Sequence, residues 1–130
     1  SVMIGIEIVD DRYTDFRAIG LPTLIADDFF NAGCVLGKPL ESWRTLDLPT
    51  LEGGFSINDQ AYTSGRGADI MGDPMVALAW LADHMTMTDR QLKAGDFVML
   101  GSVVKTHWFD EPGEAVAEIK GLGAVSVVFA

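Results

Sequence analysis

The sequence is poor in cysteine and in basic residues, and both shortages limit what the protein can be. A single cysteine, Cys34, excludes an internal disulfide and is typical of a cytoplasmic protein. Nine lysine and arginine residues stand against nineteen aspartate and glutamate residues, a formal net charge of −10. Such a charge repels phosphate backbones and anionic membranes, so we expect neither a nucleic-acid nor a membrane partner.

Long hydrophobic runs, linkers, internal repeats and low-complexity tracts are also missing. No apolar stretch approaches the roughly 20 residues that cross a bilayer. The 130 residues are 48% hydrophobic and 22% charged. This composition is typical of a globular chain and predicts a single domain over residues 1–130.

The first strand-like segment, Val2–Val9, carries a carboxylate among apolar residues. Alternation places apolar side chains on both faces, which predicts a central, covered strand. An unpaired carboxylate in that position would cost several kcal/mol. Glu7 therefore needs a metal ion or a cationic neighbour such as Arg12 or Arg17, and its spacing alone does not choose between them.

The remaining pattern is β-rich. Residues 10–33 read as irregular, with a turn at Gly20–Pro22, and residues 38–51 read as loop. A hairpin turning at Asn58–Asp59 joins two short strands. The predicted strands after Val2–Val9 are Phe55–Ile57, Ala61–Thr63, Phe97–Val104, Ala115–Ile119 and Val125–Phe129.

One principal helix is predicted at about residues 74–87. Asp73 can cap its N-terminus, and Pro74 suits the first helical position, where a missing N–H does no harm. Apolar residues then recur at helical spacing. The fold class predicted from these patterns is α+β, with several strands and one main helix.

Few other residues suggest chemistry. Asp27 and Asp28 are adjacent acids that either form a turn or place one carboxylate in a site. The stretch GRGADIMG does not fit a phosphate-binding loop, because position 70 is isoleucine and no lysine follows. The two histidines are far apart, and no serine or cysteine has the context of a nucleophile.

Five motifs in order resemble a known family. IEIVDDRYTDF, LIADDFF, GRGADIMGDPMVALAWLAD, LKAGDFVMLGS and GLGAVSVVF follow one another over nearly all of the chain. This series is similar to the 2-keto-4-pentenoate hydratase and 4-oxalocrotonate decarboxylase group of the fumarylacetoacetate hydrolase superfamily. The resemblance implies a mixed-sheet β-roll of the C-terminal domain type, bound to a divalent metal, Mg²⁺ or Mn²⁺. It also implies substrates that are 2-oxo or 2-hydroxydienoic acids, which chelate the metal.

The resemblance assigns roles to particular residues. Glu7 matches the third metal carboxylate of the group, in a motif where the relatives have EIVDSR. Arg12 matches the arginine of the same motif and would orient or neutralise nearby acids, and Asp27 matches an acidic catalytic position. Ser102 matches a serine or threonine near the substrate carboxylate, to which its hydroxyl could donate.

Two departures from the group matter. Its ADNAS motif stands here as ADDFF, so Asp28 replaces an amide at a substrate-binding position, and Phe30 replaces a hydroxyl. This substitution puts the identity of the substrate in doubt. The group's chains are also about twice as long. Their Glu-x-Glu metal ligands and catalytic lysine lie in an N-terminal half that this sequence does not contain.

We therefore expect the chain to be the C-terminal half of such an enzyme, as an expression fragment, a proteolytic product or a natural short form. The expected partners are the missing N-terminal half or a second chain, in a homo-oligomer. The leading hypothesis is a metal-dependent hydratase of aromatic-compound catabolism. The alternatives are a 2-oxo acid decarboxylase or another C–C lyase on the same scaffold, and a non-catalytic fragment or assembly half.

Overall fold

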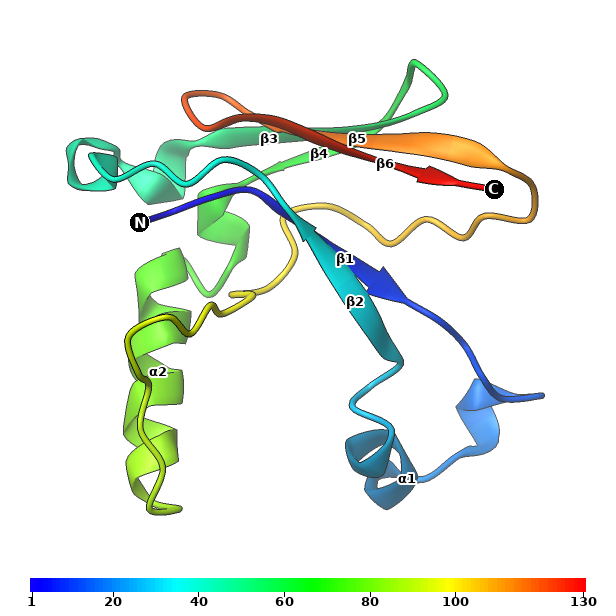
Figure 1. Cartoon of the computed structure of the whole chain (residues 1–130), viewed down its shortest axis with the longest axis horizontal. Coiled ribbons are helices and arrows are strands. Elements are labelled where there is room, and N and C mark those ends of the chain that lie inside the picture. Colours follow the sequence, from blue (N-terminus) through cyan, green and yellow to red (C-terminus); the bar gives the residue numbers. More distant parts are fainter.

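A computed structural model describes residues 1–130, and it has two antiparallel sheets and one long helix. A four-stranded sheet has the order β4-β3-β5-β6, and β1 and β2 form a separate two-stranded ribbon. Figure 1 shows the ribbon crossing beneath the larger sheet, with α2 standing to one side and α1 at the far end of the ribbon. The elements are β1 (Gly5–Val9), α1 (Leu21–Ala26), β2 (Asn31–Leu36), β3 (Glu52–Ile57), β4 (Gln60–Arg66), α2 (Pro74–Thr86), β5 (Gly113–Ile119) and β6 (Gly123–Phe129), with short 3₁₀ turns at Phe16–Ala18, Trp43–Thr45, Leu48–Thr50 and Gly67–Asp69.

Local sequence rules account for several of these elements. Asn58 and Asp59 both have positive φ, of 48° and 63°, as the two central residues of a type I′ hairpin require. Asp73 accepts a hydrogen bond at 2.8 Å from the amide of Met75, and Pro74 opens α2. The predicted α+β class with one principal helix is confirmed, as are the hairpin and the two C-terminal strands.

Other predictions were wrong or incomplete. The strand predicted at Val2–Val9 begins at Gly5, with an isolated bridge from Val2 to Leu40 before it. The stretch predicted to be irregular contains α1 and the first half of β2. Phe97–Val104 forms no strand, because no neighbouring strand pairs with its main chain.

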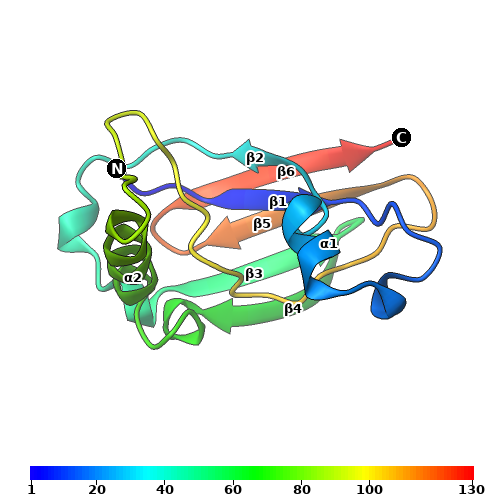
Figure 2. The same cartoon turned by 90° about the horizontal axis from the view of Figure 1, so that it is seen from below.

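The core is small and lies where the ribbon meets the sheet. Its buried apolar residues include Ile4 and Ile6 on one side of the ribbon and Ala115 on β5. Figure 2, seen from below, shows β1 and β2 in front of the larger sheet, and both strands of the ribbon lie close to β6. Only 6 of 130 residues are buried, and no residue of α2 is among them. A helix that is apolar on most sides and at most half-buried on one is typical of a core helix that lacks some of its neighbours.

The accessible surface leads to the same conclusion. The chain exposes 9115 Å², whereas a folded monomer of 14.0 kDa exposes about 6,700 Å² by the usual scaling with mass. The excess of about 2,400 Å² is roughly three times what one partner buries in a standard interface. This surface is suited to being covered by further polypeptide. No helix has the length and apolar character that crossing a bilayer requires.

Candidate functional site

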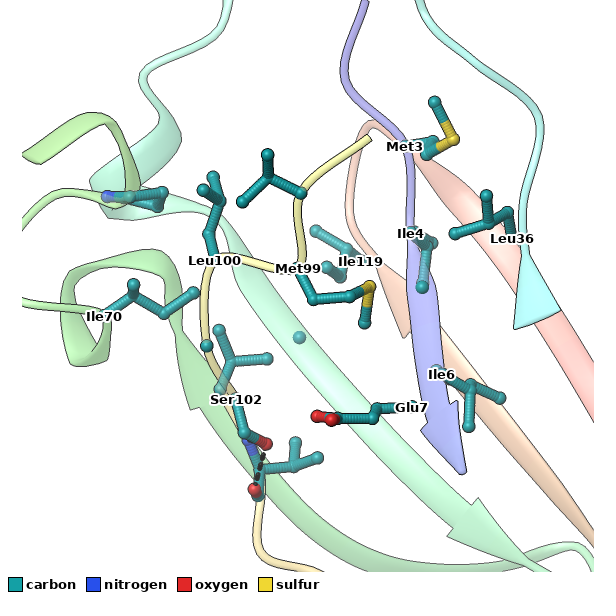
Figure 3. Close-up of a pocket in the computed structure, with 18 of the residues that line it drawn as sticks. Met3, Ile4, Ile6, Glu7, Leu36, Ile70, Met99, Leu100, Ser102 and Ile119 are labelled. Atoms are coloured by element: carbon teal, nitrogen blue, oxygen red, sulfur yellow. Dashed lines mark hydrogen bonds between the residues drawn. The ribbon is translucent and has the colours of Figure 1, made fainter. Parts of the chain in front are cut away.

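A large open cavity lies between the ribbon and the larger sheet. Its volume is about 1310 Å³, and 29 of its 47 lining residues are hydrophobic. The lining comes from β1, from β3 and β5, from the start of α2 and from the segment 92–109. Figure 3 shows Glu7 extending from β1 into this space, toward the part of the chain that carries Ser102.

Glu7 is exposed to the cavity and has no partner. It lies on β1 directly opposite Cys34 of β2, and its carboxylate takes part in no hydrogen bond or ion pair. The prediction that β1 is covered on both faces was wrong, because Ile4 and Ile6 pack in the core while the opposite face is only partly covered and Glu7 on it is exposed. Exposure to solvent removes the desolvation cost that burial would impose on this carboxylate.

The cationic neighbours considered for Glu7 are engaged elsewhere. Arg12 donates from Nη1 to Oδ1 of Asp27 at 2.8 Å, lies 4.0 Å from the carboxylate of Asp10 and also donates to the carbonyl of Asn31. Arg17 lies over the ring of Phe16. A protein cation does not neutralise Glu7, so its carboxylate remains free to contact a ligand in the cavity.

Asp27 sits at the C-terminal end of α1 and is mostly covered, with 14% of its side chain exposed. Besides accepting from Arg12, it accepts from the amide of Phe30 at 3.1 Å. Asp28, Phe29 and Phe30 all have positive φ, of 56°, 50° and 67°, which is rare for three consecutive residues with side chains. The two oxygens of Asp27 therefore hold this tight turn, and neither Asp27 nor Asp28 lines the cavity.

Tyr13 is a neighbour of this ion pair that sequence reasoning missed. Partial burial raises the pKa of its hydroxyl above the ordinary value of 10.0, and the charge of Asp27 raises it further. The only signal in the sequence is its position directly after Arg12. Its ring packs edge-on against Phe30 at 6.0 Å, which ties the DDRY stretch to the turn after α1.

Ser102 lines the same cavity as Glu7. Its hydroxyl donates to the carbonyl of Val104 and accepts from the amide of Val104 at 3.3 Å. A hydroxyl in a local turn of this kind can rotate to a ligand without breaking any long-range contact. The structure thus brings Glu7 and Ser102 to one cavity, while the Arg12–Asp27 pair lies beside it.

No group of three or more histidine, cysteine, aspartate or glutamate side chains is placed to hold a metal ion. Mg²⁺ in proteins takes one or two carboxylates together with water and substrate oxygens. Glu7 fits such a site as one donor, because its carboxylate is free and faces the cavity. The residues of this chain do not complete the donor set.

Known proteins resemble this chain in sequence, although no protein-family model matches it. It is 34% identical over 125 residues to 2-keto-4-pentenoate hydratase of Burkholderia vietnamiensis, covering 96% of this chain and 47% of the relative. It is 27% identical over 128 residues to 4-oxalocrotonate decarboxylase of Pseudomonas putida, covering 98% and 48%.

A solved structure resembles the chain in fold as well. The 4-oxalocrotonate decarboxylase of Pseudomonas putida G7, complexed with magnesium and adipate, matches with a TM-score of 0.86 at 26% identity. The match covers 95% of this chain and 47% of that one. The resemblance to the hydratase and decarboxylase group is therefore confirmed in sequence and in fold. The chain spans about half the length of the curated relatives it matches.

Proposed function

We propose that this chain is the C-terminal half of a divalent-metal-dependent lyase, and that the whole enzyme adds water to a 2-hydroxydienoate or its 2-oxo-enoate form. The observation that carries the proposal is the match to hydratases and decarboxylases over almost the entire chain. The cavity supports it, because a free carboxylate and a serine hydroxyl face the same space. Such enzymes serve the catabolism of aromatic compounds, and we place the protein in the cytoplasm.

Glu7 is proposed as one ligand of Mg²⁺ or Mn²⁺, with the remaining carboxylates supplied by the other half. The bound ion would act as a Lewis acid on the 2-oxo or enol oxygen of the substrate. Glu7 itself would offer one anionic oxygen at a fixed place on β1, held by the pairing with β2. Its present exposure lets a hydrated ion approach without a prior rearrangement of the strand.

Ser102 is proposed to orient the substrate by donating from Oγ to its carboxylate. That donation replaces the present hydrogen bond to the carbonyl of Val104. In a chain with a net charge of −10, a local donor and a cation are needed to hold an anionic substrate. The apolar lining of the cavity would accommodate the unsaturated carbon chain and restrict water to the site of addition.

Arg12 and Asp27 are proposed to form an ion pair that supports the site from beside the cavity, without lining it. Arg12 neutralises Asp27 and Asp10, and Asp27 fixes the turn that leads into β2. The catalytic roles that the resemblance assigns to both stay predictions. The substrate-binding role of Asp28 also stays a prediction, and its exposed side chain would have to turn to reach the cavity.

Decarboxylation of a 2-oxo acid is the second candidate, because relatives of both activities match this chain. On the same scaffold the enolate left by loss of carbon dioxide would need the same stabilisation as the dienolate of the hydratase. The third candidate is a half that assembles but does not react. Its support is the replacement of a hydroxyl-bearing position by Phe30.

The test uses the protein purified from its source cells through an affinity tag placed after Ala130. We expect consumption of a 2-hydroxydienoate that requires Mg²⁺ or Mn²⁺, with water gained and all carbon retained in the product. Release of carbon dioxide from a 2-oxo acid would assign the decarboxylase instead. The absence of both reactions, with metal present, would contradict an enzymatic role.

A further inference from the structure

Four aromatic side chains meet beside the cavity. The ring of Trp108 stacks on the ring of Phe16, with centroids 6.4 Å apart and planes inclined by 24°. Phe30 packs edge-on against Phe16 at 6.0 Å, and Tyr13 packs edge-on against Phe30 at the same distance. Of the four, only Trp108 lines the cavity, and 52% of it is exposed. We call Trp108, Phe16 and Phe30 the aromatic wall.

The aromatic wall lies beyond the two residues proposed to hold the metal and the substrate carboxylate. The amide of Asp10 donates to the carbonyl of Phe30 at 2.9 Å, and Asp10 is three residues past Glu7, about 10 Å along an extended chain. Trp108 is six residues past Ser102 and lines the same cavity. Figure 2 shows the chain after β1 and the segment before β5 extending toward the same end of the molecule. A substrate held by its carboxylate end at Glu7 and Ser102 would therefore point its distal end toward Trp108.

The neighbours of Trp108 in the chain are anchored on the larger sheet. His107 packs edge-on against Tyr62 of β4, with ring centroids 4.7 Å apart. Phe109 stacks on Phe129 of β6 at 4.5 Å. The indole of Trp108 is thus held from both sides of the segment and by its contact within the aromatic wall. An aromatic face that is already in place loses little side-chain freedom when a ligand lies on it.

The charges near the aromatic wall disfavour an anionic ligand end. Asp10 and Asp11 line the cavity, and the cation that follows them, Arg12, is already paired with acids. Lys105 is the cation of the cavity lining that is nearest to Trp108 in the sequence, which leaves two acids against one cation. A second carboxylate at the distal end of the substrate would lose water and meet this excess of negative charge. An uncharged apolar end would lie on the indole face instead.

Phe30 gives this end of the cavity its particular character. The hydratase and decarboxylase group has a hydroxyl-bearing residue there, in the motif ADNAS. A phenyl ring packs against Phe16, which in turn stacks on Trp108. The substitution that puts the substrate in doubt therefore adds apolar support behind the one wall residue that faces the cavity.

We propose that Trp108 is the specificity-determining residue for the distal end of the substrate, and that it selects 2-oxo or 2-hydroxydienoic acids ending in an uncharged alkyl or aryl group over those ending in a second carboxylate. Phe16 and Phe30 act through Trp108 as positioning residues. The inference rests on the proposed function in taking the substrate carboxylate to lie at Glu7 and Ser102. It deepens that function by naming the chemistry of the opposite end.

The experiment measures binding of three saturated 2-oxo acids, which lack the double bond to which water would add. They are 2-oxobutanoate, 2-oxo-4-phenylbutanoate and 2-oxoadipate, and each is titrated in a calorimeter, with Mg²⁺ present, into the protein purified from its source cells through a tag after Ala130. We expect the phenyl acid to bind at least about tenfold more tightly than either of the others, because its ring is buried against the indole.

Three variants purified in the same way locate the effect. Trp108→Ala should lose at least about tenfold in affinity for the phenyl acid and leave 2-oxobutanoate binding unchanged. Trp108→Phe should keep most of the preference, because it retains an aromatic face. Trp80→Ala is the matched control, since Trp80 is similarly exposed, at 58%, and does not line the cavity. It should bind all three acids as the parent does.

The competing results are equally definite. Tightest binding of 2-oxoadipate would overturn the proposal and would indicate that Lys105 meets a second carboxylate. Equal losses for the phenyl acid and 2-oxobutanoate in Trp108→Ala, or the same loss in Trp80→Ala, would reduce Trp108 to a structural role and also overturn it. A parent protein that binds none of the three acids contradicts both the wall and the site.

Turnover of an unsubstituted 2-hydroxydienoate is measured on the same samples as a separate reading. An active parent with no preference for the phenyl acid rejects the role of Trp108 and keeps the proposed function. A preference that disappears in Trp108→Ala, in a protein without turnover, keeps Trp108 as a ligand-binding residue and rejects the proposed function.

Discussion

Gly53 on β3 and Gly65 on β4 stand directly opposite each other, and Val103 packs against both of them. A Cβ on Gly65 would overlap the carbonyl oxygen of Val103 and lie 2.8 Å from Oδ2 of Asp69. A Cβ on Gly53 would lie 3.2 Å from a methyl group of Val103. The pair of glycines therefore forms a notch in the sheet that lets the segment carrying Ser102 pass close to it.

The first prediction concerns this notch. We expect Gly65→Ala to lower the free energy of unfolding by about 1–3 kcal/mol, because the added methyl group meets main-chain atoms that cannot move independently. Gly54→Ala is the matched control, since Gly54 is on the same sheet and a Cβ added to it would meet nothing within 4 Å. It should change the stability by less than about 1 kcal/mol. Urea denaturation of the purified variants measures both, and equal effects would contradict the role of the notch.

The second prediction concerns the ion pair between Arg12 and Asp27. Their charged atoms are 2.8 Å apart, with side-chain exposures of 38% and 14%. A double-mutant cycle with Arg12→Ala and Asp27→Asn should give a coupling energy of about 1 kcal/mol, because the carboxylate is largely shielded from water.

A control cycle is available in the same molecule. Arg66 and Glu52 are 3.2 Å apart, but both are mostly exposed, at 67% and 63%. Their coupling should be below about 0.5 kcal/mol. Thermal or urea denaturation of the parent and the single and double variants of each pair gives both values. A coupling at Arg12–Asp27 no larger than that of the exposed pair would show that the turn after α1 does not depend on it.

The elements that could be predicted from the sequence are those governed by local rules. The turn at Asn58–Asp59 depends on two residues that tolerate positive φ, and α2 depends on Asp73 and Pro74 at its start. Both signals lie within a few neighbouring residues. Neither requires knowledge of what the element packs against.

The failed predictions each depended on a partner distant in the sequence. Phe97–Val104 has the composition of a strand, but a strand exists only when another main chain pairs with it. β2 was missed because it follows three residues with positive φ, Asp28, Phe29 and Phe30, and no local rule predicts that conformation for phenylalanine. The open face of β1 was missed because alternation shows which residues share a face and does not show whether that face is covered.

The candidate site was only partly predictable for a related reason. Glu7 could be identified because it is a charged residue in an apolar strand. That Ser102 belongs to the same site followed only from the resemblance to a known group. The long stretch of sequence between them carries no pattern that would bring the two to one cavity. Tyr13 was missed because its raised pKa comes from partial burial and from the charge of Asp27, which the folding of α1 brings close to it.

The third prediction concerns Glu7. In the protein purified from its source cells, Glu7→Gln should weaken Mg²⁺ or Mn²⁺ binding by at least the tenfold to hundredfold typical of losses in the outer shell of a metal site. The stability without metal should change by less than about 0.5 kcal/mol, because the side chain is exposed and unpaired. Titration calorimetry with each metal measures the affinity.

Glu111→Gln is the control for Glu7, since Glu111 is an exposed glutamate that does not line the cavity. It should leave the metal affinity unchanged. A Glu7→Gln protein that binds metal as tightly as the parent would remove Glu7 from the metal site. Equal losses in both variants would indicate a general effect of negative charge instead of direct ligation.

The fourth prediction concerns alkaline pH. Partial burial and the charge of Asp27 raise the pKa of Tyr13 above 10.0, so the folded protein keeps this proton at a pH where the unfolded chain has begun to lose it. The stabilisation associated with Tyr13 is therefore fully present below about pH 10 and is lost as the pH rises through the higher folded-state pKa.

Urea midpoints measured from pH 9 to about pH 11.5 should fall more steeply in the parent than in Tyr13→Phe. Tyr62→Phe is the control, because Tyr62 takes no part in this ion pair and donates to the carbonyl of Thr106; its slope should match that of the parent. Identical slopes in all three proteins would mean that the Asp27 carboxylate does not act on the Tyr13 hydroxyl, and the link between the DDRY stretch and the turn after α1 would then rest on ring packing alone.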